Sequence, residues 1–428
     1  MNGDHLHIRL WLATLAAAGA LATPLQAQFF YAITNGTVTI TGYYGSSAVL
    51  VTPSTINNLP VTRVGEGAFT NRTDLTSVIV SNNVAAMSVG DYAFYGLEGL
   101  TNAAIGTNVT SIGNHAFDSC TRLNNFTMAD SVTNIGDYAL YKCFDLRAAK
   151  IGNGVMRIGQ YAFSGCVTLT SVAVPNSVID LANHAFDACT RLTRVAIGRE
   201  VTNIGDFVFN DCQSLTDVGI PDSVTNIGGD AFAGCGLTNV TIGDGVVSIG
   251  YGAFEDCGGL ARVSIPDSVI SIGGDAFWGC DGLTVAVIGG GVTDIGQDAF
   301  YLCPDLTGVY FRGNAPATEA PLFNGDDRVT IYYSPGTVGW DSPLAGLPAV
   351  LWEARMQANR PSFGVRTDVF GFQITGTAGI PIVVEASENP QGGNWIGLLT
   401  GSITNGSIYF SDPGWTNYST RFYRIRSP

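Results

Sequence analysis

The chain lacks the short motifs that mark the common classes of enzyme. It contains no G-x-S-x-G, no H-E-x-x-H, no phosphate-binding loop and no dinucleotide-binding fingerprint. No two cysteines have the C-x-x-C spacing of a zinc site. Only four histidines occur in 428 residues, and two of them, His5 and His7, lie at the very start. We therefore expect no enzyme, no cofactor and no metal site.

Positive charge is also scarce. The formal net charge is −15, and lysine occurs only as Lys142 and Lys150. A phosphate backbone or an anionic lipid surface is held by clusters of Lys and Arg. This composition therefore argues against nucleic acid and anionic lipid as partners.

A long apolar run occurs only near the start of the chain. Arg9 is followed by an apolar stretch from Leu10 to Leu21, and then by Leu25-Gln26-Ala27. This order is typical of a secretory signal peptide cleaved after Ala27. The run is shorter than the roughly 20 residues of a membrane span. We expect an exported protein whose mature chain does not cross a membrane.

The nine cysteines reveal an internal repeat. They follow one another every 23 residues, with one interval of 22: Cys120, Cys143, Cys166, Cys189, Cys212, Cys235, Cys257, Cys280 and Cys303. A regular period between 20 and 50 residues indicates a solenoid. In this stack His115 and His184 are three periods apart, about 14 Å, which is too far to share a metal ion.

The repeat reads A-F-x-x-C-x-x-L-x-x-V-x-I-x-x-x-V-x-x-I-G. Strict alternation in L-x-x-V-x-I predicts a short strand with one face in the core. V-x-x-I-G predicts a second extended stretch. Asp or Asn before Ala-Phe, as at Asp91 and Asn114, predicts the N-cap of one helical turn. One such unit cannot bury its own apolar face, so neighbouring units must stack.

This pattern resembles the BspA-type leucine-rich repeat family. The stretches AFSGCVTLTSVAVPNSVIDLA and VFNDCQSLTDVGIPDSVTNIG match the family unit nearly position by position. The resemblance spans about residues 64–311 and implies a mainly β leucine-rich-repeat solenoid of about eleven 23-residue units with short helical turns. A small C-terminal antiparallel β domain follows, which resembles modules of other exported bacterial proteins.

These signals divide the chain into six parts. The parts are a signal peptide (1–27), an N-terminal β cap (28–62), the solenoid (63–311), a degenerate repeat with a C-terminal cap (312–352), a linker (353–360) and a small β-sandwich-like module (361–428). Within the solenoid we expect the cysteines to be free thiols that form a ladder in the core. In-register side chains point the same way and cannot easily adopt a disulfide dihedral.

Aromatic residues recur two positions before the anchor phenylalanine in the N-terminal half. The series is Tyr92, His115, Tyr138, Tyr161, His184 and Phe207, with Tyr95 and Tyr141 just after the anchor. In the C-terminal half the same position holds Asp230, Gly252, Asp275 and Asp298. Stacked rings offer contact area at low entropic cost, so they are the candidate binding residues. A covering role for the edge of the core explains the same pattern.

The sequence therefore predicts an exported, non-enzymatic interaction or adhesion protein, secreted or associated with the bacterial cell surface. Its partner would be a protein or a glycan outside the cell, bound on the solenoid surface. The alternative is a passive structural component of a cell-surface or matrix layer without a discrete ligand.

Overall fold

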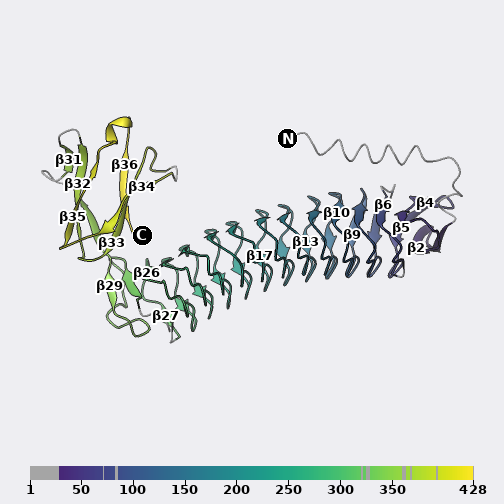
Figure 1. Cartoon of the computed structure of the whole chain (residues 1–428), viewed down its shortest axis with the longest axis horizontal. Helices are drawn as coiled ribbons and strands as arrows, with labels where there is room; N and C mark the ends of the chain where they lie inside the picture. Colours follow the sequence, from purple (N-terminus) through teal and green to yellow (C-terminus); the bar gives the residue numbers. More distant parts are fainter. Residues whose placement is uncertain are drawn as a thin grey trace. The chain divides into compact units, whose positions relative to one another are not determined.

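The computed structural model describes residues 28–427 apart from 71, 82–84, 320–321, 324–327, 359–362, 367–368 and 392–393. The signal peptide expected at 1–27 lies outside the described residues. The chain divides between Val178 and Ile179 into two compact units. Each unit contains coils of a β-solenoid, in which strands of successive coils lie side by side (Figure 1).

The N-terminal unit contains two sheets. The first has the order β1-β2-β5-β7-β9-β11-β13, with β4 beside β5. Its strands are β1 (Phe29–Thr34), β2 (Thr37–Tyr43), β4 (Thr55–Ile56), β5 (Leu59–Val64), β7 (Met87–Val89), β9 (Val109–Ile112), β11 (Asn134–Ile135) and β13 (Arg157–Ile158). The second has the order β12-β10-β8-β6-β3. Its strands are β3 (Val49–Val51), β6 (Ser77–Val80), β8 (Asn102–Ile105), β10 (Asn125–Met128) and β12 (Ala148–Lys150); β14 (Ser171–Ala173) follows.

The C-terminal unit continues with the same coil. One sheet has the order β15 (Asp180–Leu181), β17 (Asn203–Ile204), β19 (Asn226–Ile227), β21 (Ser248–Ile249), β23 (Ser271–Ile272), β25 (Asp294–Ile295) and β27 (Ala317–Thr318). The alternating strands are β16 (Arg194–Ala196), β18 (Asp217–Gly219), β20 (Asn239–Thr241), β22 (Arg262–Ser264), β24 (Val285–Ile288), β26 (Gly308–Phe311), β28 (Thr330–Tyr333) and β29 (Ala349–Leu351). Pairing between coils is parallel and in register, as in Ile272↔Ile295.

The core of each unit consists of columns in which the same residue type recurs from coil to coil, with few exceptions such as Leu140. The anchor phenylalanines are completely buried and stack on one another, as Phe254 and Phe277 do with ring centroids 5.3 Å apart. All nine cysteines are buried and free. Their thiols donate to an anchor carbonyl of the preceding coil, as Cys120 does to Phe94 at 3.1 Å. Burial raises the pKa of Cys120 to about 12, so the sulfur behaves as a small core hydrophobe.

The short helical turns take a different form from the one the sequence suggests. The segment around Ala-Phe is a run of tight turns, and no α-helix occurs in the described part of the chain. Its backbone bonds to the next coil, with Phe94 N donating to Ala116 O at 2.8 Å. Asp91 is no helix cap, because its Oδ1 accepts from the backbone N of Asn114 at 2.8 Å. The turns are therefore a third inter-coil ladder.

The C-terminal module is built from two antiparallel sheets. One contains β30 (Ala354–Gln357), β31 (Phe363–Arg366), β32 (Val369–Gly376) and β35 (Ser407–Asp412); the other contains β33 (Pro381–Ser387), β34 (Ile396–Ser402) and β36 (Phe422–Arg426). A 3-10 turn, η2, covers Trp415–Asn417. The expected linker at 353–360 is therefore wrong in part. Residues 354–357 form β30, which pairs with β32, because Ala354 and Met356 pack against the module core.

Candidate binding surface on the turn segments

In the coils from Phe94 to Phe300, the turn segments place two residues per coil in a left-handed backbone conformation, one two positions before the anchor and one two positions after it, as at His115 and Ser119. In the N-terminal unit the first of these positions holds Gly67, Tyr92, His115, Tyr138 and Tyr161, with φ between 52° and 57°. This region costs energy for any residue with a Cβ and is normally occupied by Gly, Asn or Asp. The backbone N–H at this position donates to the next coil, as His115 N does to Asp137 O at 2.9 Å, which holds the conformation even where the side chain is aromatic.

These four rings form a continuous stack, which we call the ring column. Tyr92 and His115 lie 4.6 Å apart between ring centroids with planes 5° from parallel. His115 and Tyr138 are separated by 4.6 Å and 3°, and Tyr138 and Tyr161 by 4.7 Å and 11°. Each such pair contributes about 0.5–1.5 kcal/mol beyond its area burial. The sequence-predicted residues of this unit are thus brought together.

Two further tyrosines lie across the ring column. Tyr95 meets Tyr92 edge-on with centroids 5.7 Å apart, and Tyr141 meets Tyr138 at 5.3 Å and 85°. Tyr92 and Tyr95 are the most open, at 39% and 40% exposure. The faces of the inner rings are covered by their neighbours. The column therefore offers ring edges and polar tips to solvent.

In the C-terminal unit His184 and Phe207 form a ring pair of the same kind. Their centroids are 4.6 Å apart and their planes 2° from parallel. Both residues have left-handed φ values, 59° and 57°. The next coil places Asp230 at this position, so the aromatic series ends at Phe207.

Each histidine is oriented by a carboxylate that the sequence analysis did not single out. His115 Nδ1 lies 2.7 Å from Asp118 Oδ2, and His184 Nδ1 lies 3.0 Å from Asp187 Oδ2. Ser119 Oγ donates to the other oxygen of Asp118 at 2.7 Å. A usable signal was present, since both histidines occur in the pentapeptide N-H-A-F-D. A carboxylate on Nδ1 fixes the ring orientation.

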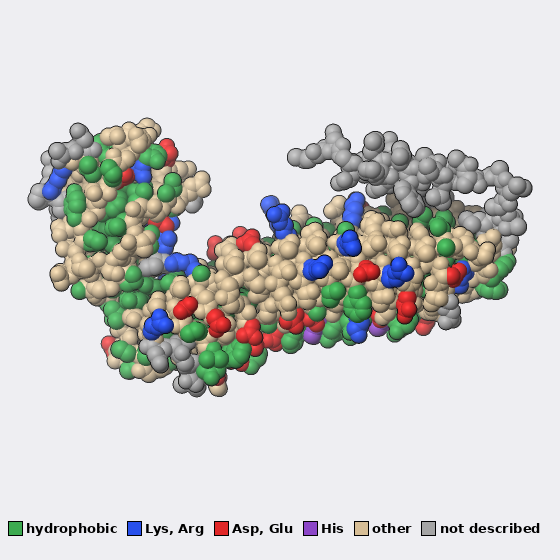
Figure 2. All heavy atoms as spheres, in the orientation of Figure 1, with side chains coloured by type: hydrophobic (Ala, Val, Ile, Leu, Met, Phe, Trp, Pro, Cys, Tyr) green, Lys and Arg blue, Asp and Glu red, His purple; other side chains and the backbone are tan. Residues whose placement is uncertain are grey.

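Figure 2 shows red acidic side chains next to green hydrophobic ones on the surface of the solenoid. In the C-terminal unit, acidic residues occupy the edge formed by the turn segments, with Asp230, Asp275 and Asp298 at left-handed backbone positions. Burial, followed by repulsion from Asp206 and Asp275, raises the pKa of Asp230. Burial and the Asp230 charge raise the pKa of Glu255. This part of the edge is thus a dense row of carboxylates.

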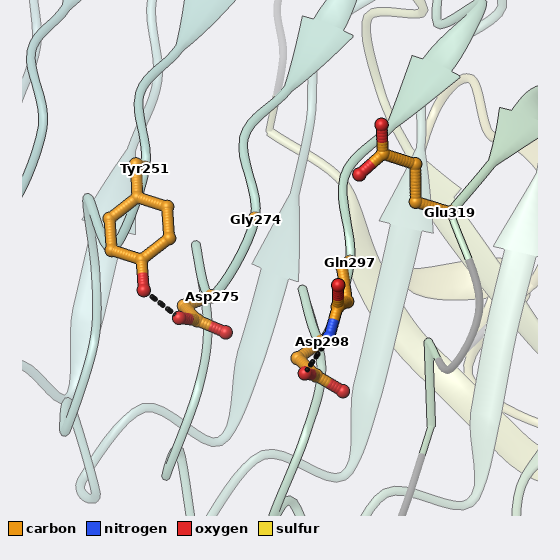
Figure 3. A pocket seen from close by; sticks show the side chains of 6 residues that line it. All are labelled: Tyr251, Gly274, Asp275, Gln297, Asp298 and Glu319. Carbon is orange, nitrogen blue, oxygen red and sulfur yellow. Dashed lines mark hydrogen bonds between the residues drawn. The ribbon is translucent and has the colours of Figure 1, made fainter.

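A shallow hollow of about 330 Å³ lies in this acidic row. Figure 3 shows its lining residues, which are Tyr251, Gly274, Asp275, Gln297, Asp298 and Glu319. The Tyr251 hydroxyl donates to Asp275, and this hydrogen bond raises the pKa of Tyr251 to about 12. Gln297 Nε2 donates to Asp298 Oδ2 at 2.9 Å. The lining therefore consists of polar groups, one phenol hydroxyl, one amide and three carboxylates, together with the glycine.

No group of three or more His, Cys, Asp or Glu side chains is placed to hold a metal ion in the part of the chain that is described. Within those same residues, no helix is long and apolar enough to cross a membrane.

Comparison with known proteins identifies the repeat. The family model for the BspA type leucine rich repeat region matches residues 47–166, 87–216, 133–257 and 202–330, which together exceed half of the chain. A search of curated proteins finds no match.

Several solved structures are similar to the chain. A leucine-rich repeat protein from Bacteroides ovatus is 20% identical over 78% of this chain and 100% of its own, with a TM-score of 0.46. The pneumococcal vaccine antigen PcpA is 17% identical over 76% of this chain and 91% of its own, with a TM-score of 0.48. A leucine-rich cell surface protein from Faecalibacterium prausnitzii is 24% identical over 69% of this chain and 95% of its own, with a TM-score of 0.37.

Proposed function

Because the chain belongs to the BspA-type leucine-rich repeat family, we propose that it is an exported, non-enzymatic interaction protein that binds a partner protein outside the cell. The binding surface is the ring column with Tyr95 and Tyr141 beside it. In the C-terminal unit, His184 and Phe207 form a separate candidate contact. The single observation that carries this proposal is the unbroken stack from Tyr92 to Tyr161, held at left-handed backbone positions.

The exposed parts of the ring column favour a protein over a glycan. A sugar that stacks on an aromatic side chain needs an open ring face. The inner rings, His115 and Tyr138, have both faces covered by the neighbouring rings. Tyrosine edges and hydroxyls suit instead the mixed apolar and hydrogen-bonding contacts of a protein interface.

The stack also prepares the surface for binding. Each ring is held by its neighbours, and His115 is held in addition by Asp118. Side chains that are already ordered lose little conformational entropy when a partner binds. Tyrosine is among the residues that most often dominate interface energies. A row of pre-ordered tyrosines is therefore a suitable anchor for a protein partner.

Export is part of the proposal and rests on the leader expected at residues 1–27. The nine buried thiols suit this location, since they lie in the core away from oxidants. We expect the exported protein to remain associated with the cell surface, as is expected of BspA-type leucine-rich repeat proteins. The repeat itself supplies a scaffold.

The proposal is tested by capturing partners on the exported protein. The protein is purified after export, immobilised and exposed to an extracellular-matrix extract and to intact host cells. Retained proteins are identified by mass spectrometry, and their affinity is measured. We expect Tyr138→Ser combined with Tyr161→Ser to weaken the retained partner by about 30-fold or more, as the loss of an interface hot spot does.

The matched control is Tyr251→Ser combined with Tyr409→Ser, which removes two exposed tyrosines outside the ring column. Melting temperatures establish that all variants remain folded. Equal binding by the ring-column variant and the control would refute the proposed surface. Retention of polysaccharide in place of protein would contradict the choice of partner. Self-assembly without any retained partner would favour the structural-layer alternative.

A further inference from the structure

The N-terminal cap ends in an exposed strand. β1 lies at the end of its sheet and pairs only with β2 among the described residues. Residues 30–34 are all exposed, and Phe30 and Ile33 are 58% and 52% exposed. Tyr44 adds a further exposed ring, with its centroid 5.1 Å from that of Phe30. The cap therefore presents an open backbone edge together with apolar side chains.

This edge lacks most devices that keep edge strands from pairing. Such devices are charged side chains, especially Lys, proline, bulges, or a covering segment. β1 contains no charged residue and no proline. It has one irregularity, between Phe30 and Tyr31, which leaves Tyr31–Thr34 in regular pairing geometry. The edge from Tyr31 onward is therefore competent to accept another strand.

The last strand of the β22-β24-β26-β28-β29 sheet, β29, is covered by other residues of the chain, unlike β1 within the described residues. Trp352 directly follows β29 and donates from Nε1 to Pro381 O of the module at 2.9 Å. Tyr332 and Val350 pack against the buried cluster around Phe372. The chain thus covers the sheet end at β29 with its own residues, whereas β1 carries no such cover in the described structure.

The charge distribution identifies what fits on β1. The chain has a net charge of −15, so two copies repel each other over most of their surface. Residues 28–62 contain no Asp, Glu, Lys, Arg or His. Arg72, which donates to Tyr43 O, is paired with Asp74 at 2.8 Å, so two copies that meet through this cap bring no unpaired charge of the cap together. Antiparallel pairing of a strand with its own copy is two-fold symmetric. Each copy therefore supplies the backbone hydrogen-bond partners that the edge of the other copy lacks.

We propose that β1 is a self-association surface, through which two copies of this chain pair antiparallel and join their sheets. This inference is independent of the proposed binding function. A six-residue strand with a few apolar side chains buries less than about 1,200 Å², which is typical of weak and transient complexes. We therefore expect a dimer that forms in the range of about 10–100 µM.

Sedimentation velocity of the exported protein, from about 1 to 300 µM, tests the proposal. We expect the mass to rise from monomer to dimer, and the dimer to strengthen when salt screens the net charge. Ile33→Lys places like charges at the pairing edge and should abolish the dimer. Val338→Lys is the matched control, since Val338 is 65% exposed and lies far along the chain from β1. Melting temperatures check that both variants fold.

Hydrogen exchange supplies a second measurement on the unaltered chain. The amides of residues 31–34 that do not already donate to β2 should exchange about 3- to 8-fold more slowly at the highest concentration than at the lowest, because pairing protects them. A chain that stays monomeric throughout, or a dimer that survives Ile33→Lys with no change in β1 exchange, overturns the proposal.

Discussion

The Nδ1 atom of His115 lies 2.7 Å from Oδ2 of Asp118. Asp118 is only 5% exposed, and its second oxygen accepts from Ser119. The imidazole between two tyrosine rings is therefore fixed in its plane by a buried carboxylate. The ring column depends on this hydrogen bond as well as on the stacking itself.

Removal of that carboxylate should loosen the ring column. We expect Asp118→Ala to leave the imidazole N–H without its partner and to lower the free energy of unfolding by about 1–3 kcal/mol. Partner binding should fall with it. Denaturant unfolding measures the first effect and affinity the second. Asp145→Ala, at an exposed site without this contact, should change neither.

The anchor phenylalanines should dominate stability. Phe232→Ala removes a completely buried ring from the core stack, and we expect it to cost about 3–5 kcal/mol. Phe232→Leu should cost much less, because Leu140 occupies the same slot with no exposed surface. Urea-unfolding midpoints of the two variants distinguish the effects. Equal losses of stability in Phe232→Ala and Phe232→Leu would show that the volume of the buried side chain does not determine the cost.

The thiols of the cysteine ladder should not react with alkylating reagents in the folded protein. Burial raises the pKa of Cys120, Cys166 and Cys280 to about 12, and the reactive species is the thiolate. We expect no measurable alkylation by iodoacetamide at neutral pH, and reaction of all nine thiols once the chain is unfolded in denaturant. Mass spectrometry counts the adducts. Rapid labelling of any ladder cysteine in the folded protein would contradict the buried core.

The C-terminal module should lose stability in acid through Glu385. Burial would raise the pKa of Glu385, but hydrogen bonds from Arg426 and Arg424 outweigh it and hold the pKa below its usual range. A carboxyl group whose pKa is lowered by folding stabilises the folded state at pH values above its pKa in the unfolded chain, about 4.3. This stabilisation disappears as the pH falls through the pKa of the group in the folded chain.

We expect Glu385→Gln to destabilise the protein at pH 7 by about 1–3 kcal/mol and to flatten the decline in melting temperature between about pH 5 and pH 3. Glu388→Gln, which neutralises an exposed carboxylate in the same module, is the control. If the melting temperature of Glu385→Gln falls as steeply between about pH 5 and pH 3 as that of the unaltered chain, groups other than Glu385 cause the loss of stability in acid.

Neutralising a carboxylate of the acidic row should raise stability at pH 7, in contrast to Glu385→Gln, which should lower it. Burial and the charges of Asp206 and Asp275 raise the pKa of Asp230. A raised carboxyl pKa destabilises the fold above the folded value and has no effect below the unfolded value. We expect Asp230→Asn to raise stability at pH 7 by less than about 1 kcal/mol, since solvent screens the row, and to have no effect near pH 3. Thermal melts at the two pH values check this.

Much of the solenoid could be predicted because its determinants repeat. Nearly every coil puts the same type of residue into the same column, so one sequence period defined the strands, the anchors and the sulfur ladder. The turn geometry was harder. Asp and Asn before Ala-Phe resemble helix caps, yet Asp91 bonds to the next coil. Gly252 and Asp275 at the ring position were the available sign of a left-handed backbone.

The candidate surface was predictable as a set of residues, but its form was not. Spacing alone indicated that Tyr92, His115 and Tyr138 lie over one another. It did not show that their faces are covered, which changes the kind of partner they fit. The strand at Ala354–Gln357 was also missed, because its pattern is short and its partner strand β32 is not its neighbour in the sequence.

The one shortened coil shows how the architecture tolerates change. A residue is missing between Cys235 and Leu237, yet Val218 still pairs with Val240 and the anchor stack continues unaltered. Gly236 occupies the tightened corner, where a Cβ would lie 2.3 Å from the carbonyl oxygen of Gln213. Insertions and deletions confined to such corners leave neighbouring ladders aligned. Recombination between coils can thus lengthen or shorten the solenoid, and with it the edge formed by the turn segments, without a new fold having to evolve.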